Sequence, residues 1–269
     1  MTMDHGQRRG DKTMSERPVY VLSEMSWPEA KAALETVRVA LIAVGSSEQH
    51  GPNLAMQADT AQAYAFVTKL AELLSSPNAS RPAVARGSVR YHMNFPGSLT
   101  LRPETFYAFL HDVIESLSRH GLKKFLLING HGGNAATLGM SLVRLKRELD
   151  VEVAHLDFYT MAPEVAQEYV VSDVWGHACE IEVSMSMYLA PHIVKTDTLA
   201  KGDIKGYPYT LNPGGGSRKV NYPYSFDAVT ANGCLGDATQ ATAEKGRVMI
   251  EACLDRASEF LEDYIAGPK

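Results

Sequence analysis

The chain has 269 residues, of which 45% are hydrophobic and 21% are charged, and this is the composition of an ordinary globular protein. Its formal net charge is -5 and its Lys and Arg residues are scattered, which argues against nucleic-acid and membrane partners and favours a small-molecule ligand. The three cysteines are odd in number and far apart, so they fit neither a disulfide framework nor a zinc knot, and we expect a cytoplasmic protein.

The sequence divides into a short polar tail and one continuous domain. Residues 1–17 are charged and lack an apolar run, so they predict a disordered tail that is neither a secretory signal nor a membrane anchor. Over residues 18–269, helical and strand patterns alternate without a long Pro/Ser/Gly linker. This alternation predicts a single α/β domain.

Runs of β-branched and apolar residues predict buried strands, and apolar residues at helical spacing predict helices. The first strand stops at Gly45, and the helix at 103–117 has Pro103 in its first turn and Gly121 just past its end. This β-loop-α succession predicts a mostly parallel sheet, because crossovers are right-handed. In chain order we predict strand 37–44, helix 60–74, strand 83–91, helix 103–117, strand 123–128, helix 138–149, strand 151–159, helix 180–189 and helix 250–264.

Polar clusters follow the strands at 37–44 and 123–128. Ligands of open parallel sheets bind beyond the carboxyl ends of the strands, so both clusters are expected at the binding edge. A Gly/Pro/Tyr-rich segment at 201–236 is too long for a plain connection. We expect it to cover the substrate.

The first polar cluster contains Glu48, His50 and Asp59. Side chains alternate along an extended chain, so Glu48 and His50 face the same side, and Asp59 at the end of the loop can return to them. Imidazole with carboxylates suits Zn, Mn or Fe(II) better than Mg or Ca. The alternative is that Glu48 and His50 are solvated and that Asp59 merely caps the helix starting at Thr60.

The second cluster is Asn129-Gly-His-Gly-Gly-Asn134, at the end of a predicted parallel strand. Its glycines allow backbone to approach a ligand closely, which favours His131 as a functional residue. Two alternatives stay open. The segment could be a tight turn with an incidental histidine, or it could cradle a phosphate at a helix N-terminus in a non-catalytic nucleotide-binding protein.

The third cluster supplies His177, Glu180 and Glu182. If a helix begins before His177, Glu180 shares the face of this histidine and Glu182 points elsewhere. If His177 lies at the helix entry, that argument lapses. Either acid could also simply stabilise the helix dipole from the first turn.

Together these motifs resemble the creatininase family. The matching blocks are Gly45 to Pro52 with Asp59, Asn129 to Asn134, and His177 to Ser184. The segments His92 to Ser98, Gly233 to Asp237 and Ala241 to Gly246 also resemble family blocks, in the same order along the chain. The resemblance covers the chain from about residue 18 to its end.

The resemblance implies a layered α/β/α fold, usually a homohexamer, with two divalent metal ions that hydrolyse amide bonds in cyclic, formylated or peptide-like substrates. By this analogy Glu48, His50, Asp59 and His131 are metal ligands, and Asp59 bridges the two ions. Glu182 is the preferred fifth ligand over Glu180, and His177 is the proton shuttle. The ions would be Zn, Mn or Fe.

One departure from the family pattern bears on the substrate. Creatininase itself carries a tyrosine and a glutamate just after the histidine that corresponds to His131. Here both positions are glycines, Gly132 and Gly133. This argues against creatinine, and the Gly-Gly form resembles the formylaminopyrimidine deformylases and the peptide-trimming members of the family.

Overall fold

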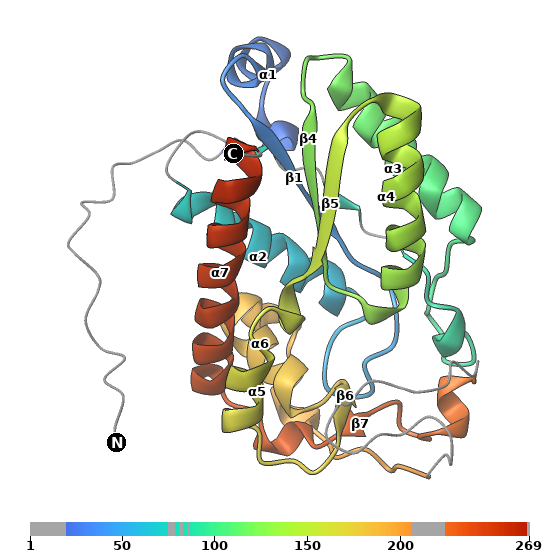
Figure 1. Cartoon of the computed structure of the whole chain (residues 1–269). Coiled ribbons are helices and arrows are strands. Elements are labelled where there is room, and N and C mark those ends of the chain that lie inside the picture. Colours follow the sequence, from blue (N-terminus) through green and yellow to red (C-terminus); the bar gives the residue numbers. More distant parts are fainter. Residues whose placement is uncertain (1–19, 75–78, 81–82, 85–86, 206–223, 268–269) are drawn as a thin grey trace, which may run out of the picture.

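The computed structural model describes residues 20–74, 79–80, 83–84, 87–205 and 224–267 (Figure 1). The predicted tail at 1–17 lies outside the described residues. So does the part of the predicted substrate-covering segment at 206–223. Both therefore stay predictions.

A parallel sheet forms the centre of the molecule (Figure 1). β1 (Val39–Val44) pairs with β4 (Lys124–Asn129), which in turn pairs with β5 (Glu152–Asp157). The short strands β2 (Ala79–Ser80) and β3 (Ala83–Val84) pair with β1 near its beginning and its end. All these pairings are parallel, which confirms the mostly parallel sheet predicted from the sequence.

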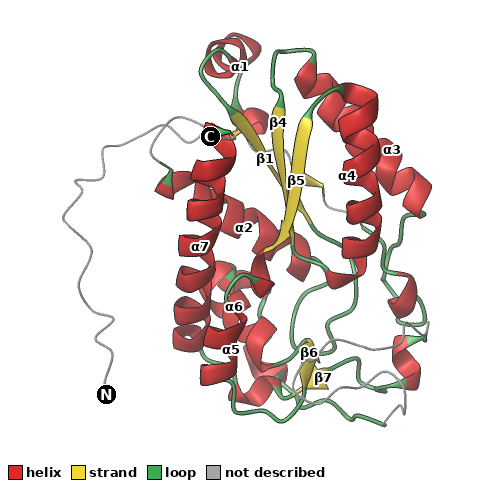
Figure 2. Cartoon of the chain, viewed as in Figure 1, coloured by secondary structure: helices red, strands yellow, loops and turns green. Residues whose placement is uncertain are grey.

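Helices cover both faces of this sheet, so the fold has three layers (Figure 2). They are α1 (Trp27–Leu34), α2 (Ala58–Leu73), α3 (Pro103–Ser118), α4 (Ala135–Leu149), α5 (Pro163–Tyr169), α6 (Glu180–Leu189) and α7 (Ala243–Ala266). Strand side chains alternate between the faces: Leu41 of β1 packs in the core with α2, α6 and α7, whereas Ile42 packs in the core with α3 and α4. The expected α/β/α layering is confirmed.

The predicted strand at 83–91 is confirmed for residues 83–84 and wrong for residues 87–91. Strand β3 covers Ala83–Val84, and Arg90–His92 form a 3-10 turn. The backbone N-H groups of Ser88 and Val89 donate to side chains of other loops instead of to a neighbouring strand. Ser88 N donates to the side chain of Asn134, and Val89 N donates to the hydroxyl of Thr100. These bonds replace a strand ladder.

Three helices begin earlier than their apolar spacing predicts, and one of them, α4, starts at Ala135 instead of residue 138. Helix α7 starts at Ala243, where Thr242 is the N-cap and its hydroxyl accepts from Lys245 N. Helix α2 starts at Ala58, with Gln57 at the N-cap. Asp59 is therefore inside the first turn, and the interpretation that Asp59 only caps a helix starting at Thr60 is wrong.

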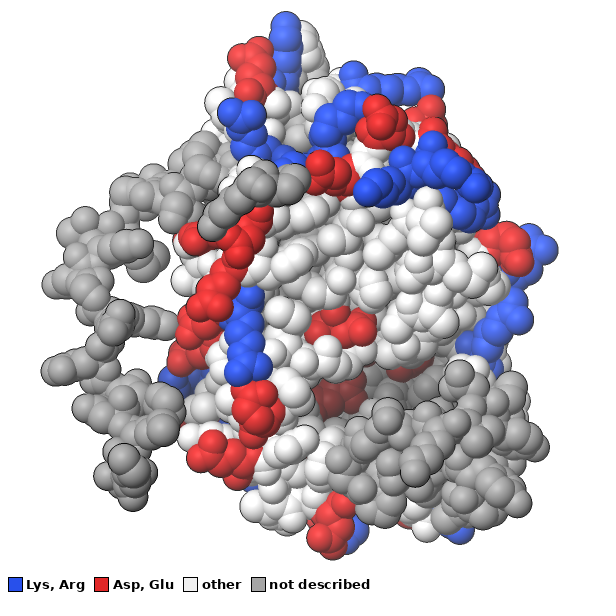
Figure 3. Space-filling model, in the orientation of Figure 1, with Lys and Arg blue, Asp and Glu red and all other residues white. Residues whose placement is uncertain are grey.

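On the face drawn in Figure 3, positive and negative side chains are interspersed around the rim. In the described part of the chain, no helix is long and apolar enough to cross a membrane. Cys179, Cys234 and Cys253 are buried and free.

Candidate metal centre

The carboxyl edge of the sheet gathers the first two polar clusters. Glu48 and His50 follow β1, His131 follows β4, and Asp59 comes from the start of α2. The loop after β4 can approach the start of α2 because Gly130 has no side chain. A Cβ at this position would lie 2.4 Å from the backbone oxygen of Asp59. The two loops and the helix start therefore meet at one point, as expected for the edge of a parallel sheet.

His177 and Glu182 reach the same point from a second, smaller sheet and from α6. Strand β6 (Trp175–His177) pairs antiparallel with β7 (Leu235–Gly236). Because α6 begins at Glu180, His177 precedes the helix, and the helical-face argument that would have favoured Glu180 does not apply.

Asp59 lies at the centre of the cluster. Its Oδ1 is 3.1 Å from His50 Nε2, and that nitrogen is also 3.1 Å from Glu182 Oε1. Its Oδ2 is 3.3 Å from His131 Nδ1, and that nitrogen is 3.1 Å from Glu48 Oε1. Glu48, His50 and Asp59 are each only 1% exposed. The two carboxylate oxygens of Asp59 therefore face two different histidine-glutamate pairs.

Backbone carbonyls fix the orientation of these two histidines. His50 Nδ1 lies 3.1 Å from the carbonyl oxygen of Glu48, and His131 Nε2 lies 3.1 Å from that of Ser88. A carbonyl oxygen only accepts, so each of these nitrogens carries the proton and donates. In the neutral ring, the other nitrogen then presents a lone pair to the acids, which is the arrangement of a metal-binding histidine.

His177 has the same kind of support. Its Nε2 donates to the carbonyl oxygen of Gln49 at 2.6 Å, and its Nδ1 is 3.7 Å from Glu48 Oε1. Burial, together with charge on His50, lowers the pKa of His177 below its ordinary value. The buried Nδ1 is therefore a lone pair aimed into the cluster, suited to accepting a proton or to holding a cation.

Of the two acids on α6, Glu182 faces the cluster. Its Oε2 accepts from the backbone N-H of Ala178 at 2.5 Å, which leaves Oε1 toward His50. Ala178 makes this bond in the left-handed conformation, with φ of 49°. Glu180 is fully buried elsewhere, where it accepts from Ser172 and from Lys245. The structure therefore brings Glu182, and not Glu180, to His50.

The donor set fits divalent cations. Oε2 of Glu48 is buried and has no hydrogen-bond partner. Among the described residues, it is the one buried side-chain oxygen or nitrogen that lacks such a partner. Such an atom is costly unless it has a partner, and a cation is the partner a carboxylate oxygen takes most readily. Three carboxylates and imidazole lone pairs, with no thiolate among them, suit Zn, Mn or Fe(II).

Protons and cations would compete for the same lone pairs. Burial opposes charging of His50, but Glu182 and Asp59 outweigh it and raise the pKa of His50 well above its ordinary value. Burial opposes charging of His131 as well, and Glu48 and Asp59 raise its pKa. Against burial, these two histidines hold the pKa of Asp59 well below its usual range. A cation must therefore displace protons from both histidines.

His92 is a member of the cluster that the sequence did not single out as a site residue. It is buried, and its Nε2 is 3.8 Å from Glu48 Oε2. Burial, then charge on the neighbouring histidines, lowers the pKa of His92 to about 2. Its hydrogen-bond partner is Gln49, and its ring stacks on Phe226. Both partners lie far away in the sequence, so local spacing does not indicate the role of this histidine. The signal in the sequence is the block His92 to Ser98, which resembles a family block and begins at this residue.

The two asparagines of the Asn129 to Asn134 loop hold the loop together. Asn129 Nδ2 donates to the carbonyl oxygen of His131 and to Asp157, and its Oδ1 accepts from Asn134 Nδ2. Three carboxylates of the cluster lie close to His131 and His50. A phosphate without a cation would meet repulsion from these acids, so the geometry disfavours the phosphate-cradle alternative.

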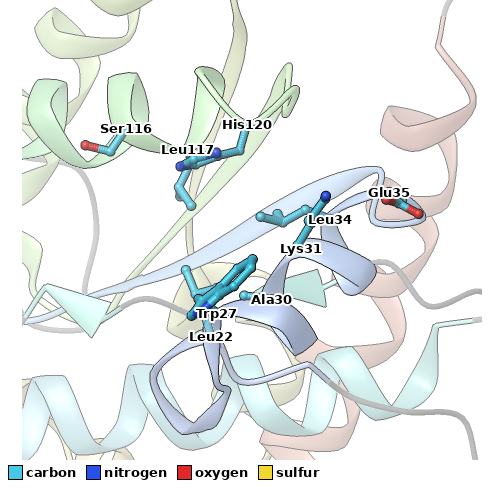
Figure 4. A pocket seen from close by; sticks show the side chains of 9 residues that line it. All are labelled: Leu22, Trp27, Ala30, Lys31, Leu34, Glu35, Ser116, Leu117 and His120. Carbon is cyan, nitrogen blue, oxygen red and sulfur yellow. The ribbon is translucent and has the colours of Figure 1, made fainter.

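A separate apolar hollow of about 590 Å³ lies between α1 and the end of α3. Figure 4 shows Trp27 and Leu34 on one side of it and Leu117 and His120 on the other. These elements lead into the amino ends of β1 and β4. The hollow is therefore at the edge of the sheet opposite to the cluster, and it does not contribute to the candidate metal centre.

Comparison with known proteins assigns the chain to a family. Residues 23–261 match the Creatininase family, described as creatinine amidohydrolase. The chain belongs to the creatininase family. The resemblance predicted from the sequence is thus confirmed, and the chain is an amidohydrolase of this family.

The chain is similar to family members with different names. Mycofactocin precursor peptide peptidase of Mycolicibacterium smegmatis is 30% identical over 236 residues, which are 84% of this chain and 87% of that protein. Creatinine amidohydrolase of Pseudomonas putida is 25% identical over 259 residues, or 90% and 96% of the two chains. A solved mutant creatininase of the Zn-Zn type is 25% identical with a TM-score of 0.74, covering 91% of this chain and 98% of that one.

The packing around His131 explains why a glycine stands at one of the two positions after it in this creatininase-family chain. A Cβ on Gly133 would lie 2.3 Å from His131 Nε2 and 2.7 Å from the Ser88 carbonyl oxygen, so it would occupy the place of the bond between them. A Cβ on Gly132 would meet only the hydroxyl of Tyr159, at 3.5 Å. Gly133 is therefore needed for the observed orientation of His131, whereas position 132 has room for a small side chain.

Proposed function

We propose that the chain is a metal-dependent amidohydrolase that holds two divalent cations, Zn, Mn or Fe, and cleaves a C-N amide bond with water. Glu48, His50, Asp59, His131 and Glu182 are the proposed ligands. The observation that carries the proposal is the placement of Asp59 between two histidine-glutamate pairs, which suits a carboxylate shared by two cations. The solved relative of the Zn-Zn type supports the same number of ions.

When bound, divalent cations of this kind lower the pKa of water from 15.7 to about 7 and polarise a carbonyl group. The protein must also move a proton from the attacking water to the departing amine. His177 is the proposed shuttle, because its Nε2-H is held by the carbonyl of Gln49 and its Nδ1 lone pair faces the cluster. The bond to Gln49 also keeps the ring in place while Nδ1 gains and loses the proton.

We infer that the substrate is an open-chain amide, such as a formamide or a short peptide, rather than creatinine. Gly133 supplies no carboxylate where creatininase carries a glutamate, and the packing around it leaves no room for one while His131 keeps its bond to Ser88. The similarity to a peptide peptidase points in the same direction. A homohexamer, as the family resemblance implies, and a location in the cytoplasm, as the cysteine content indicates, are parts of this proposal.

The test combines metal analysis with two variants. Asp59→Ala should lose both the bound metal and the hydrolysis of any amide, since no other side chain of the cluster faces both pairs. His177→Ala should keep the metal and slow hydrolysis by about 10²- to 10⁴-fold, the range for general acid-base groups. Asp112→Ala, an exposed carboxylate on α3, is the control and should change neither.

Metal content is measured by mass spectrometry of the purified protein, and activity is screened on formamides, short peptides, lactams and cyclic ureas. Two metal ions retained by Asp59→Ala would disprove the shared carboxylate. Metal lost from His177→Ala would make His177 a ligand instead of a shuttle. A wild-type protein that binds phosphate compounds tightly and holds no metal would favour the nucleotide-binding alternative.

A further inference from the structure

We propose that His92 is a catalytic residue that donates a hydrogen bond from Nε2-H to an oxygen atom of the substrate, and that Gln49 holds it in this role. The proposal rests on the proposed amide hydrolysis and names a further residue for it. It separates His92 from the other three histidines of the cluster, each of which presents a lone pair.

The place of His92 is set by two neighbouring rings that pack against it and against each other. It ends the 3-10 turn Arg90–His92 and is 6% exposed. The ring of Phe226 stacks on it at 4.3 Å between centroids with 24° between planes, and the ring of His177 lies 4.6 Å away. The edge that carries Nε2 points toward Glu48, with 3.8 Å between Nε2 and Oε2. The ring of His92 is therefore held in place at the side of the candidate metal centre.

The orientation of the Gln49 amide is fixed independently of His92. The backbone N-H of Gly51 donates to Gln49 Oε1 at 2.8 Å. Gln49 Nε2 donates to the carbonyl oxygen of Gly233 at 3.1 Å. Turning the amide over would place an amide N-H against a backbone N-H and an amide oxygen against a carbonyl oxygen, so both bonds would be lost.

This orientation decides which nitrogen of His92 carries the proton. Gln49 Nε2 is 3.0 Å from His92 Nδ1, and an amide nitrogen can only donate. His92 Nδ1 must accept, so the proton of the neutral ring is on Nε2. For His50, His131 and His177 the partner is a carbonyl oxygen, which puts the proton on the outer nitrogen and frees the inner one.

The different tautomer gives His92 a different task. A nitrogen that carries a proton has no lone pair for a cation, so His92 cannot be a ligand through Nε2, although Glu48, His92 and His177 are close enough together to resemble a ligand group. A neutral N-H held beside the cluster is instead suited to an acceptor oxygen. Every amide substrate brings one, the carbonyl oxygen, on which negative charge grows during attack by water.

Two variants at this position separate the donor from the ring. His92→Phe keeps the aromatic stack on Phe226 and removes the donor, whereas His92→Gln can return an amide N-H near the position of Nε2. On the amide substrate found by screening, we expect His92→Phe to lower kcat by about 10²- to 10³-fold, as for loss of an oxyanion donor, with a smaller change in KM. His92→Gln should recover a large part of kcat. Both variants should hold as much metal as the wild type.

The second measurement does not depend on activity. NMR of protein labelled with ¹⁵N-histidine reports which ring nitrogen carries the proton, and the signals missing from His92→Phe identify those of His92. We expect the Nε2-H tautomer in the metal-loaded protein.

A proton on Nδ1, metal loss from His92→Phe, or unchanged kcat in that variant would each overturn the proposal. Failure of the proposed function itself looks different, as a wild-type protein that holds no metal or hydrolyses no amide. The tautomer measured by NMR still decides whether His92 is a donor in that case.

Discussion

At the scale of single residues, sequence spacing predicted which side chains meet but not how they face one another. The alternation of side chains placed Glu48 and His50 on the same side, and both do join the cluster. In the structure, however, Glu48 faces His131 while His50 faces Glu182, with Asp59 between them. The carbonyl groups that orient the rings of His50 and His177 belong to Glu48 and Gln49, inside the first motif, and the one that orients His131 belongs to Ser88, outside the motifs. The motifs do not say which ring each carbonyl group contacts.

The glycine pair offers a prediction at this scale. Gly133→Ala should weaken metal binding by about 10- to 100-fold, because its Cβ would displace His131 from the Ser88 carbonyl that orients it. Gly132→Ala is the matched control, since its Cβ meets only the Tyr159 hydroxyl at ordinary contact distance. Titration of the metal-free proteins with Zn²⁺ measures both affinities. Equal affinities for the two variants would contradict the role given to Gly133.

At the scale of elements, long periodic segments were predictable and short ones were not. Helices α3 and α6 and strand β4 lie within a residue or two of their predicted bounds. Strands β6 and β7 have only three and two residues, and they pair although they are far apart in the sequence. No local sequence pattern predicts such short strands. Yet β6 carries His177 to the cluster, which is why its position relative to α6 stayed open in the sequence.

The contact between α6 and α7 supports a second prediction. Glu180 is fully buried at the start of α6, and Lys245 of α7 donates to it at 2.5 Å. Lys245→Met should destabilise the protein by about 3 kcal/mol, because it leaves a buried carboxylate without its cation. Arg247→Met is the matched control on the same helix, because its partners Glu244 and Glu251 keep 68% and 41% of their side-chain surface exposed. Urea denaturation of the two variants measures the difference, and similar midpoints would disprove it.

At the scale of the whole molecule, the binding edge was predictable because it follows from topology. Parallel strands with right-handed crossovers bring all their carboxyl ends to one edge, so loops after β1 and β4 had to meet there. The ring of Phe226 and the amide of Gln49 could not be placed in advance, because their contacts with His92 depend on how distant loops pack over that edge.

Stability of the whole chain should depend jointly on metal and pH. The pKa values of His50 and His131 are raised in the folded chain without metal, so their contribution to stability is fully present below the unfolded value of about 6.5 and is lost as pH rises through the folded values. The lowered pKa of Asp59 acts in the opposite sense: its contribution is present above about pH 4 and is lost as pH falls through the folded value. The metal-free chain should therefore be most stable between these limits.

Metal binding must release the protons on His50 and His131, so the stabilisation by metal should grow with pH. We expect saturating Zn²⁺ or Mn²⁺ to raise Tm by about 5 °C or more at about pH 8, and by clearly less at about pH 6. Thermal unfolding with metal and with a chelator measures both shifts, and Asp59→Ala should show neither. A shift of the same size at the two pH values would mean that the cation does not replace protons on these histidines, and that the lone pairs facing Asp59 are not where it binds.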